Sequence, residues 1–356
     1  MVQINQKPVQ KFRFVVQSSF ALLCIWIGYD FYRFVSYFES GGSGQIYSRP
    51  PGVDGFLPIS SFMSSYLFLK TGGIHPVHPA GVFIFLAIVV MSFVVGKSFC
   101  SWLCPVGFIS EMVGDLGEKL FGKKIKIHAF LDYPLRSIKY LLLAFLFYSV
   151  FFLMTDITIK AFLDSPYNIV ADIKMYYFFA KISRFSLIII SALLILSIVF
   201  KNFWCRYLCP YGALLGLISV FSPVKIRRNK ESCIDCAACT KACPSFIKVH
   251  KANLVISDEC TSCMNCIDVC PVKDTLYLKP VLSKKQINKK YIAIAIISVF
   301  LIFTGLGIAT GFWQNNITTD EYKYYYEIID NLGHPTDTKS IKEFEKNLER
   351  REIKRF

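Results

Sequence analysis

The sequence predicts a mainly α-helical fold: a polytopic membrane helix bundle of about five transmembrane helices, with a two-hairpin internal repeat and a small inserted α+β domain. Three observations lead to this fold class. Of the 356 residues, 54% are apolar and only 18% are charged, a composition too apolar for an ordinary soluble protein. Long apolar stretches recur along the chain. Two similar cysteine motifs each follow one of these stretches, which indicates the repeat.

Each long apolar stretch is a candidate membrane span. The hydrocarbon core of a bilayer is roughly 30 Å thick and needs about 20 residues of helix. The predicted spans are residues 14–34, 82–99, 138–158, 185–203 and 291–313. The first span exceeds the apolar region of a signal peptide, and no small-residue cleavage site follows it, so we expect a retained anchor.

The basic residues predict the orientation in the membrane. Residues 1–13, 97–139 and 201–290 hold 25 of the 40 Lys and Arg, whereas 33–80 and 160–184 hold seven. Because cytoplasmic loops are enriched in Lys and Arg, we expect a multi-pass protein of the cytoplasmic (inner) membrane with its N-terminus inside. The net charge of +15 then reflects topology, and we expect membrane lipids rather than nucleic acid as partners.

The cysteines indicate metal ligation in a reducing compartment. Twelve of the 13 cysteines form four tight groups beside basic segments, unlike the even framework of a disulfide-rich domain. The remaining Cys24 lies alone in the first span and is expected to be a packing residue.

The repeat consists of "KSFCSWLCPVGFIS" at 97–110 and "KNFWCRYLCPYGALLG" at 201–216. Each copy is expected to be an outward helix, an external loop, a returning helix and then Cys-x-x-x-Cys-Pro-x-Gly at the cytosolic mouth. A pseudo-two-fold axis along the membrane normal would place the two motifs side by side. An i, i+4 spacing predicts that both thiols of each motif share one face of a helical turn, at a helix end before the proline.

Eight cysteines form two matching runs, "CIDCAACTKACP" at 233–244 and "CTSCMNCIDVCP" at 260–271. Both follow the spacing C-x2-C-x2-C-x3-C-P, in which three thiolates hold one 4Fe-4S cluster and the fourth reaches the other cluster. This predicts two 4Fe-4S clusters. The first set is Cys233, Cys236, Cys239 and Cys270, and the second is Cys260, Cys263, Cys266 and Cys243. A pair of zinc sites is the alternative, but zinc sites typically use separated cysteine pairs. Residues 230–280 resemble a two-cluster 4Fe-4S ferredoxin domain, whose function is one-electron transfer.

The other four thiols, Cys100, Cys104, Cys205 and Cys209, are candidates for a further redox or metal site. If the repeat axis is correct, they converge and could hold a third metal centre, bind a soft metal or act as redox-active dithiols. The plainer alternative is small packing residues at a tight helix junction.

Together these motifs resemble the NapH/NosR group of membrane polyferredoxins and, more distantly, the CcoG/RdxA proteins. The resemblance covers roughly residues 80–285. It implies a quinol-linked electron-transfer subunit for a respiratory reductase, with quinone as substrate and a partner redox subunit; the distant group implies copper handling. The chain departs from the pattern in its fifth span and external tail, and it lacks a flavin-attachment domain.

The sequence predicts four regions. They are a membrane domain with both Cys-x3-Cys-Pro motifs at 1–223, a ferredoxin-type domain at 224–285, a final transmembrane helix at 286–313 and an external helical tail at 314–356. The candidates for a quinone site are His75 and His78 in "GGIHPVHPAG", with Asp54 and Asp164 as weaker ones. The alternative interpretation is that both histidines are ordinary loop residues, hydrogen-bonded to the backbone or to lipid headgroups.

Three functions remain open from the sequence. The first is exchange of electrons between the quinone pool and the 4Fe-4S clusters, within a quinol dehydrogenase-type complex. The second is a ferredoxin-fed reductase for assembly of copper or other metal centres. The third is a non-catalytic anchor that docks a partner. The direction of electron flow does not follow from the sequence.

Overall fold

The computed structural model describes residues 8–281 and 286–333. The chain forms two compact units. The first comprises Met1–Cys24, Ala87–Ala144 and Phe185–Ile302, and the second Ile25–Leu86, Phe145–Arg184 and Phe303–Phe356. This grouping differs from the predicted division at residues 223, 285 and 313, and those boundaries stay predictions.

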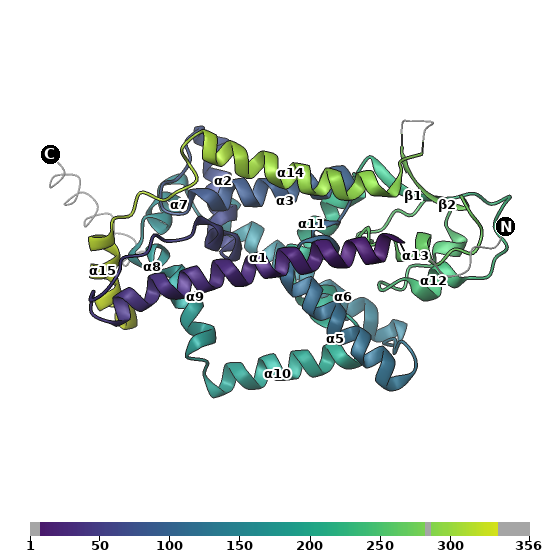
Figure 1. The fold of residues 1–356 in the computed structure, drawn as a ribbon, viewed down its shortest axis with the longest axis horizontal. Coiled ribbons are helices and arrows are strands. Elements are labelled where there is room, and N and C mark those ends of the chain that lie inside the picture. The colour runs from purple at the N-terminus through teal and green to yellow at the C-terminus, as the bar shows by residue number, and fades with distance from the viewer. Residues whose placement is uncertain (1–7, 282–285, 334–356) are drawn as a thin grey trace. The chain divides into compact units, whose positions relative to one another are not determined.

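Helices make up most of the described chain (Figure 1). The α-helices are α1 Pro8–Glu39, α2 Pro58–Thr71, α3 Pro79–Val95, α4 Phe99–Trp102, α5 Pro105–Phe121, α6 Ala129–Tyr148, α7 Asp156–Leu163, α8 Pro166–Ile169, α9 Ala171–Ala180, α10 Arg184–Val199, α11 Pro210–Val220, α12 Ala238–Ala242, α13 Asn265–Asp268, α14 Lys289–Ala309 and α15 Thr319–Glu327. Short 3₁₀ turns are η1 Pro51–Phe56, η4 Val249–Lys251 and η5 Ile329–Asn331, and π turns are η2 Ser149–Leu153 and η3 Trp204–Leu208. Proline at the first helical position begins α2, α5 and α11, where its missing N–H costs no hydrogen bond.

Three helices of the described chain are long and apolar enough to cross a membrane, Val9–Glu39, Ala129–Leu153 and Tyr291–Ala309. The number rises to four if α9 and α10, bent by 77° at their junction, form one span. Helices therefore lie at all five predicted positions. However, α3 has 17 residues and α10 has 16, so the fifth span stays a prediction.

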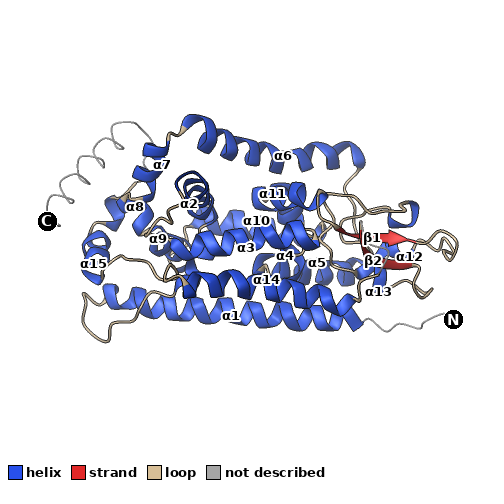
Figure 2. Cartoon of the chain, turned by 90° about the horizontal axis from the view of Figure 1, so that it is seen from above, coloured by secondary structure: helices blue, strands red, loops and turns tan. Residues whose placement is uncertain are grey.

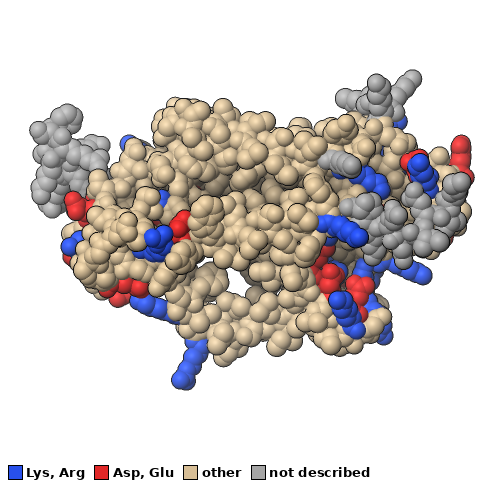
Figure 3. Space-filling model, in the orientation of Figure 1, with Lys and Arg blue, Asp and Glu red and all other residues tan. Residues whose placement is uncertain are grey.

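These long helices carry large apolar side chains on their outer surfaces. Leu22 on α1 is 65% exposed, Phe145 on α6 is 71% exposed and Leu301 on α14 is 61% exposed. Figure 3 shows few charged side chains over α14 on the face drawn. Exposed apolar side chains along helices of this length are favourable in lipid and costly in water. The chain is a multi-pass membrane protein.

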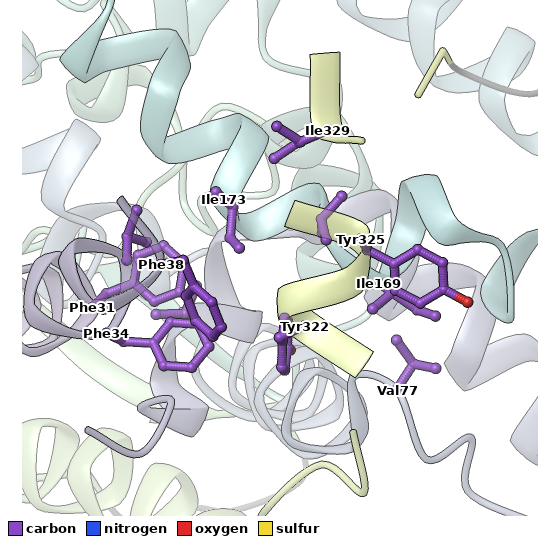
Figure 4. Packing of buried hydrophobic residues seen from close by; sticks show 12 residues of the cluster. Phe31, Phe34, Phe38, Val77, Ile169, Ile173, Tyr322, Tyr325 and Ile329 are labelled. Atoms are coloured by element: carbon purple, nitrogen blue, oxygen red, sulfur yellow. The ribbon is translucent and has the colours of Figure 1, made fainter. Parts of the chain in front are cut away.

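The second unit has a core rich in aromatic residues (Figure 4). Phe31, Phe34 and Phe38 of α1 pack with Tyr322 and Tyr325 of α15. The rings of Phe34 and Tyr322 meet edge to face with centroids 5.2 Å apart. Full burial of each such side chain contributes roughly 1.5–3 kcal/mol. Residues 319–331 of the predicted tail are therefore helical and packed, whereas 334–356 lie outside the described residues.

In the first unit, β1 Val224–Arg228 pairs antiparallel with β2 Leu276–Pro280 (Figure 2). The register joins Val224 to Pro280 and Arg228 to Leu276. The strands thus bring together the two ends of the segment that holds the eight ferredoxin-type cysteines. The short helices α12 and α13 lie close to this sheet in Figure 1, and each contains the third cysteine of its run, Cys239 and Cys266. The fold is mainly helical with one small α+β region, as predicted.

Candidate iron–sulfur sites

The eight ferredoxin-type cysteines line two separate small cavities. Each cavity has a volume of about 20 Å³ and four thiols in its wall. The first is lined by Cys233, Cys236, Cys239 and Cys270, and the second by Cys243, Cys260, Cys263 and Cys266. Each set combines three cysteines of one run with the last cysteine of the other. The two runs are therefore interleaved in the folded segment.

The two runs have the same unusual backbone. Asp235 and Ala237 in the first run, and Ser262 and Met264 in the second, all have φ between +49° and +61°. These residues stand at equivalent positions, two and four residues after the first cysteine of each run. Left-handed conformations of non-glycine residues are costly and occur mainly where a site requires them. The repetition indicates loops shaped to surround a bound group.

The thiols of the second cavity are costly to ionise without a cation. Burial, assisted by Cys263 and Cys243, raises the pKa of the Cys260 thiol to about 12. Burial also raises the pKa of Cys266 well above its usual range. A coordinated metal reverses this preference, because it holds a ligating thiol deprotonated. The donor set and its shielding fit a metal–sulfide cluster.

The cysteines of each set are spread around the wall of their cavity. In residues 8–281 and 286–333, no group of three or more His, Cys, Asp or Glu side chains is close enough to hold one ion. The four-cysteine sets therefore surround cavities rather than converge on one point.

The Cys-Pro-x-Gly motifs form helix N-termini. Cys104 is the N-cap of α5 and its sulfur accepts a hydrogen bond from the Gly107 N–H at 3.4 Å. Cys209 is the N-cap of α11 and accepts from Gly212 N–H at 3.2 Å. The proline sets the first helical residue, and the amide and helix dipole favour a thiolate at the cap. The motif thus places a sulfur at each helix N-terminus through backbone geometry, although burial raises the pKa of the Cys104 thiol well above its usual range.

One detail of the predicted geometry was wrong. The two thiols of each motif do not share one helical turn, because Cys104 (ψ 119°) and Cys209 (ψ 106°) are extended. Proline disfavours the α conformation in the residue before it. The first cysteines lie instead in the preceding turns, Cys100 in α4 and Cys205 in η3. Each motif spans a break between two helices.

All four of these thiols line one pocket, which we call the mouth site. Its volume is about 190 Å³, and Lys97, Trp204 and Tyr211 also line it. The convergence of both repeat copies agrees with the sequence expectation. The mouth site is larger than either ferredoxin-type cavity.

The mouth site adjoins the second ferredoxin-type cavity. Pro244, Ser245 and Thr261 line both. Ser101 Oγ donates to Thr261 O at 2.6 Å, and Arg206 Nη1 donates to Ser245 O at 3.0 Å. The residues directly after Cys100 and Cys205 are thus hydrogen-bonded to the loops around the second cavity.

Charged side chains around the mouth site are mostly paired. Arg206 pairs with Asp132 at 3.1 Å, and Lys139 pairs with Glu259 at 2.5 Å. Lys97 is only 3% exposed, and burial raises the pKa of the Cys100 thiol to about 11 against the opposing charge of Lys97. Sequence reasoning did not single out Lys97. The sequence does contain a feature that points to it, because both copies of the repeat begin with a lysine.

The two candidate histidines, His75 and His78, belong to the second unit, whereas the twelve grouped cysteines belong to the first. His78 Nδ1 is 3.0 Å from Asp54 Oδ1, and Nε2 is 2.7 Å from the Asn168 carbonyl oxygen, so both ring nitrogens are engaged. His75 is buried, and its Nε2 is 3.1 Å from Asp164 Oδ1 without hydrogen-bond geometry.

Asp54 is the hub of a buried ion network in the same unit. Arg49 contacts both Asp54 and Asp172 at 2.5 Å. Although burial acts to raise it, the charges of Arg49 and His78 lower the pKa of Asp54. These contacts give Asp54 and His78 a structural part in the fold.

Two family models match the chain. A "4Fe-4S binding domain" matches residues 77–127 and 185–229, and a "4Fe-4S dicluster domain" matches residues 225–271. The first match contains all four mouth cysteines and none of the eight ferredoxin-type cysteines.

The sequence is also similar to those of known proteins, over most of the chain in one case and over about half of it in two others. It is 42% identical to the "Putative electron transport protein YccM" of Escherichia coli (strain K12), over 87% of this chain and 88% of that protein. It is 30% identical to the "Ferredoxin-type protein NapH" of Haemophilus influenzae, over 52% of this chain and 64% of that protein. It is 27% identical to the "Regulatory protein NosR" of Pseudomonas aeruginosa, over 47% of this chain but only 23% of that protein. No solved structure matches the chain.

Helical membrane spans and cysteine sites matched by 4Fe-4S models define a membrane-bound iron–sulfur protein. The chain belongs to the NapH/NosR-type family of membrane polyferredoxins. Its role is iron–sulfur electron transfer.

Proposed function

We propose that this protein exchanges electrons between the quinone pool and 4Fe-4S clusters, as a subunit of a respiratory or other redox complex. The observation that carries the proposal is the placement of twelve cysteines around three neighbouring cavities in one compact unit. Bound 4Fe-4S clusters supply one-electron redox chemistry, with potentials set by charge, hydrogen bonds and exposure.

Two clusters are assigned to the ferredoxin-type cysteines. Cys233, Cys236, Cys239 and Cys270 hold one, and Cys243, Cys260, Cys263 and Cys266 hold the other. The grouping of thiols around two cavities and the repeated left-handed loop residues support this assignment. Exposed Cys236 and Ile234, the latter 63% exposed, make the first site the one most accessible to a soluble redox partner.

A third iron–sulfur centre is assigned to the mouth site, held by Cys100, Cys104, Cys205 and Cys209. Three observations support it: the shared pocket, the amide hydrogen bonds to Cys104 and Cys209, and the match of this region to a 4Fe-4S model. The second ferredoxin-type site shares wall residues with the mouth site, and its Cys243 and Cys266 each lie four residues along the chain from a cysteine of the first site, which supports an order with the second site in the middle.

The quinone would react on the membrane side of this series. The fold gives no direct contact for it, and the proposal rests here on the family. Of the two candidate histidines, His75 is the better, since both ring nitrogens lack a hydrogen bond whereas those of His78 are engaged. The inner membrane and a cytosolic position for the cysteine sites are proposed from the distribution of Lys and Arg.

Iron and sulfide analysis of anaerobically purified protein, combined with EPR, tests the number of centres. About twelve irons per chain are expected for three clusters. About eight would leave the two ferredoxin-type clusters and contradict the mouth centre. Stoichiometric copper retained by the mouth thiols would instead favour metal-centre assembly.

A quinol analogue tests the substrate. Added to oxidised protein, it should bleach the 4Fe-4S absorbance within the mixing time of a stopped-flow experiment. His75→Asn should slow this bleaching while leaving iron content and EPR spectra unchanged. Absence of bleaching in protein with full iron content would exclude quinol as a direct electron donor.

A further inference from the structure

The wall of the mouth site contains a buried lysine, Lys97, that forms no ion pair with any carboxylate of the described residues. Lys97 is 3% exposed and lines the pocket together with the four thiols. Among the residues that the structure describes, its ammonium group makes no hydrogen bond and has no carboxylate oxygen within 4.0 Å. Buried charges in proteins are normally paired or bound to an ion of opposite charge. The partner of Lys97 is therefore expected in the pocket itself.

The other cations beside the pocket do not share this property. Arg206 is paired with Asp132, and Lys139 is paired with Glu259. The carboxylate of Glu259, the acidic residue of the pocket wall, also contacts Arg136 at 3.2 Å. Arg136 also lies 3.9 Å from Asp258, so the three cations Arg206, Lys139 and Arg136 are matched by the three carboxylates Asp132, Glu259 and Asp258, and Lys97 remains as the additional positive charge.

The repeat supplies a natural comparison. Lys201 opens the second copy as Lys97 opens the first, but it pairs with Asp115 and Glu118 and does not line the mouth site. Lys97 lies three residues before Cys100, whereas Lys201 lies four before Cys205. One added residue turns a helix by about 100°, and a π turn, here η3, is the form that absorbs such an insertion. The two lysines therefore differ in their spacing from the first cysteine of the copy and in the turn that follows them.

We propose that Lys97 compensates the charge of the anionic, thiolate-ligated centre at the mouth site and shifts its one-electron equilibrium towards the reduced form. This inference rests on the proposed mouth centre. One electron taken from a reduced iron–sulfur donor adds one negative charge to the site and oxidises the donor by one electron; no bond or proton changes place. The attraction of a fixed ammonium group therefore increases on reduction, and a buried site screens it little.

Helix geometry alone does not supply this charge. The N-termini of α5 and α11 offer partial positive charge to Cys104 and Cys209, but both repeat copies do so alike. Lys97 is the asymmetric element. It also acts on both copies, because it lines the same pocket as Cys100 and Cys104 of the first copy and Cys205 and Cys209 of the second.

The test is an EPR-monitored redox titration of purified holoprotein carrying Lys97→Met, Lys97→Arg or Lys201→Met. Methionine removes the charge at similar length, arginine keeps it, and Lys201→Met removes the equivalent charge of the other copy. For Lys97→Met, the reduced-to-oxidised ratio of one centre should fall about tenfold at fixed potential, which is about 59 mV for one electron. Lys97→Arg and Lys201→Met should leave that centre within a factor of about three.

Iron analysis of the same samples tests separately whether the mouth centre exists and whether Lys97 affects it. About eight irons in the wild-type protein would overturn the mouth centre itself. About twelve irons in all variants, with equal potentials in Lys97→Met and Lys201→Met, would overturn the role of Lys97 alone. Loss of about four irons from Lys97→Met only, with the ferredoxin-type EPR signals retained, would support charge compensation as a requirement for holding the centre. Equal loss in Lys97→Arg would show that shape, not charge, matters and would overturn the proposal.

Discussion

The ferredoxin-type sites and the mouth site hold four cysteines each, but they are built by different means. In the ferredoxin-type sites, irregular loops with left-handed residues surround cavities of about 20 Å³. In the mouth site, four helix ends from two distant repeat copies border a cavity of about 190 Å³. The first design depends on local backbone conformation and the second on the packing of helices. Their responses to mutation and to loss of iron should differ accordingly.

The largest effects are expected from replacement of a cysteine in each kind of site. Cys266→Ala should remove about four irons and also disturb the first ferredoxin-type site, because α13 leads from Cys266 directly to Cys270. Cys205→Ala should remove about four irons while the ferredoxin-type EPR signals persist. Iron analysis and EPR of both variants check this. An unchanged iron content in Cys205→Ala would mean that the two sites do not bind the same kind of group.

Removal of all iron should also distinguish the designs. Without a cluster, nothing offsets the strain of left-handed residues such as Ala237 and Met264, so residues 233–270 should lose protection from amide hydrogen exchange. Helices α5 and α11 should keep theirs beyond the first turn, since Cys104 and Cys209 remain N-caps with or without metal. Exchange measured by mass spectrometry before and after anaerobic chelation tests this. Equal loss of protection in both regions would contradict the distinction.

The glycines of the two Cys-Pro-x-Gly motifs offer a matched pair. A Cβ at Gly107 would lie 2.2 Å from the Cys100 carbonyl oxygen, whereas at Gly212 it would lie 3.4 Å from the Cys205 carbonyl oxygen. Gly107→Ala must therefore move backbone at the mouth site, at a cost of roughly 1–3 kcal/mol. Gly212→Ala should be nearly neutral.

Thermal unfolding in detergent and the EPR signal of the mouth centre measure the effects of the two substitutions. Similar destabilisation by both would show that the two copies of the repeat are packed alike, contrary to the close contact at Gly107.

The contrast also explains what the sequence could predict. Cysteine spacing and Pro fix a local loop, so the membership of each ferredoxin-type set follows from the pattern C-x2-C-x2-C-x3-C-P. The convergence of Cys100 and Cys205 could be expected only through the repeat, because their proximity depends on contacts between segments about 100 residues apart. The membrane helices could be predicted from apolar length, but the bend of 77° between α9 and α10 could not.

Single polar contacts were beyond sequence reasoning. Lys201 pairs with Asp115, whereas Lys97 has no ion pair within the part of the chain that the structure describes, and one residue of spacing to the first cysteine is the difference that the sequence shows between them. Likewise, Asp54 and His78 were singled out as loop residues near a candidate quinone site, yet they are buried together around Arg49. Charge pairing depends on which surfaces meet, and composition carries no record of it.

The smallest expected effect concerns the bond between the two kinds of site. Ser101→Ala removes the hydrogen bond from Ser101 Oγ to the Thr261 carbonyl, which links the mouth segment to the second ferredoxin-type loop. The expected loss is about 1 kcal/mol of unfolding free energy, since the carbonyl remains buried without this partner. Ser232→Ala is the control, because Ser232 Oγ lies 2.8 Å from Thr275 Oγ1 within the ferredoxin-type segment and neither residue lines the mouth site. If the mouth site relies on the contact at Thr261 for its position, Ser101→Ala should broaden the EPR signal of the mouth centre and Ser232→Ala should not. Equal broadening in both variants would mean that the contact at Thr261 does not position the mouth site.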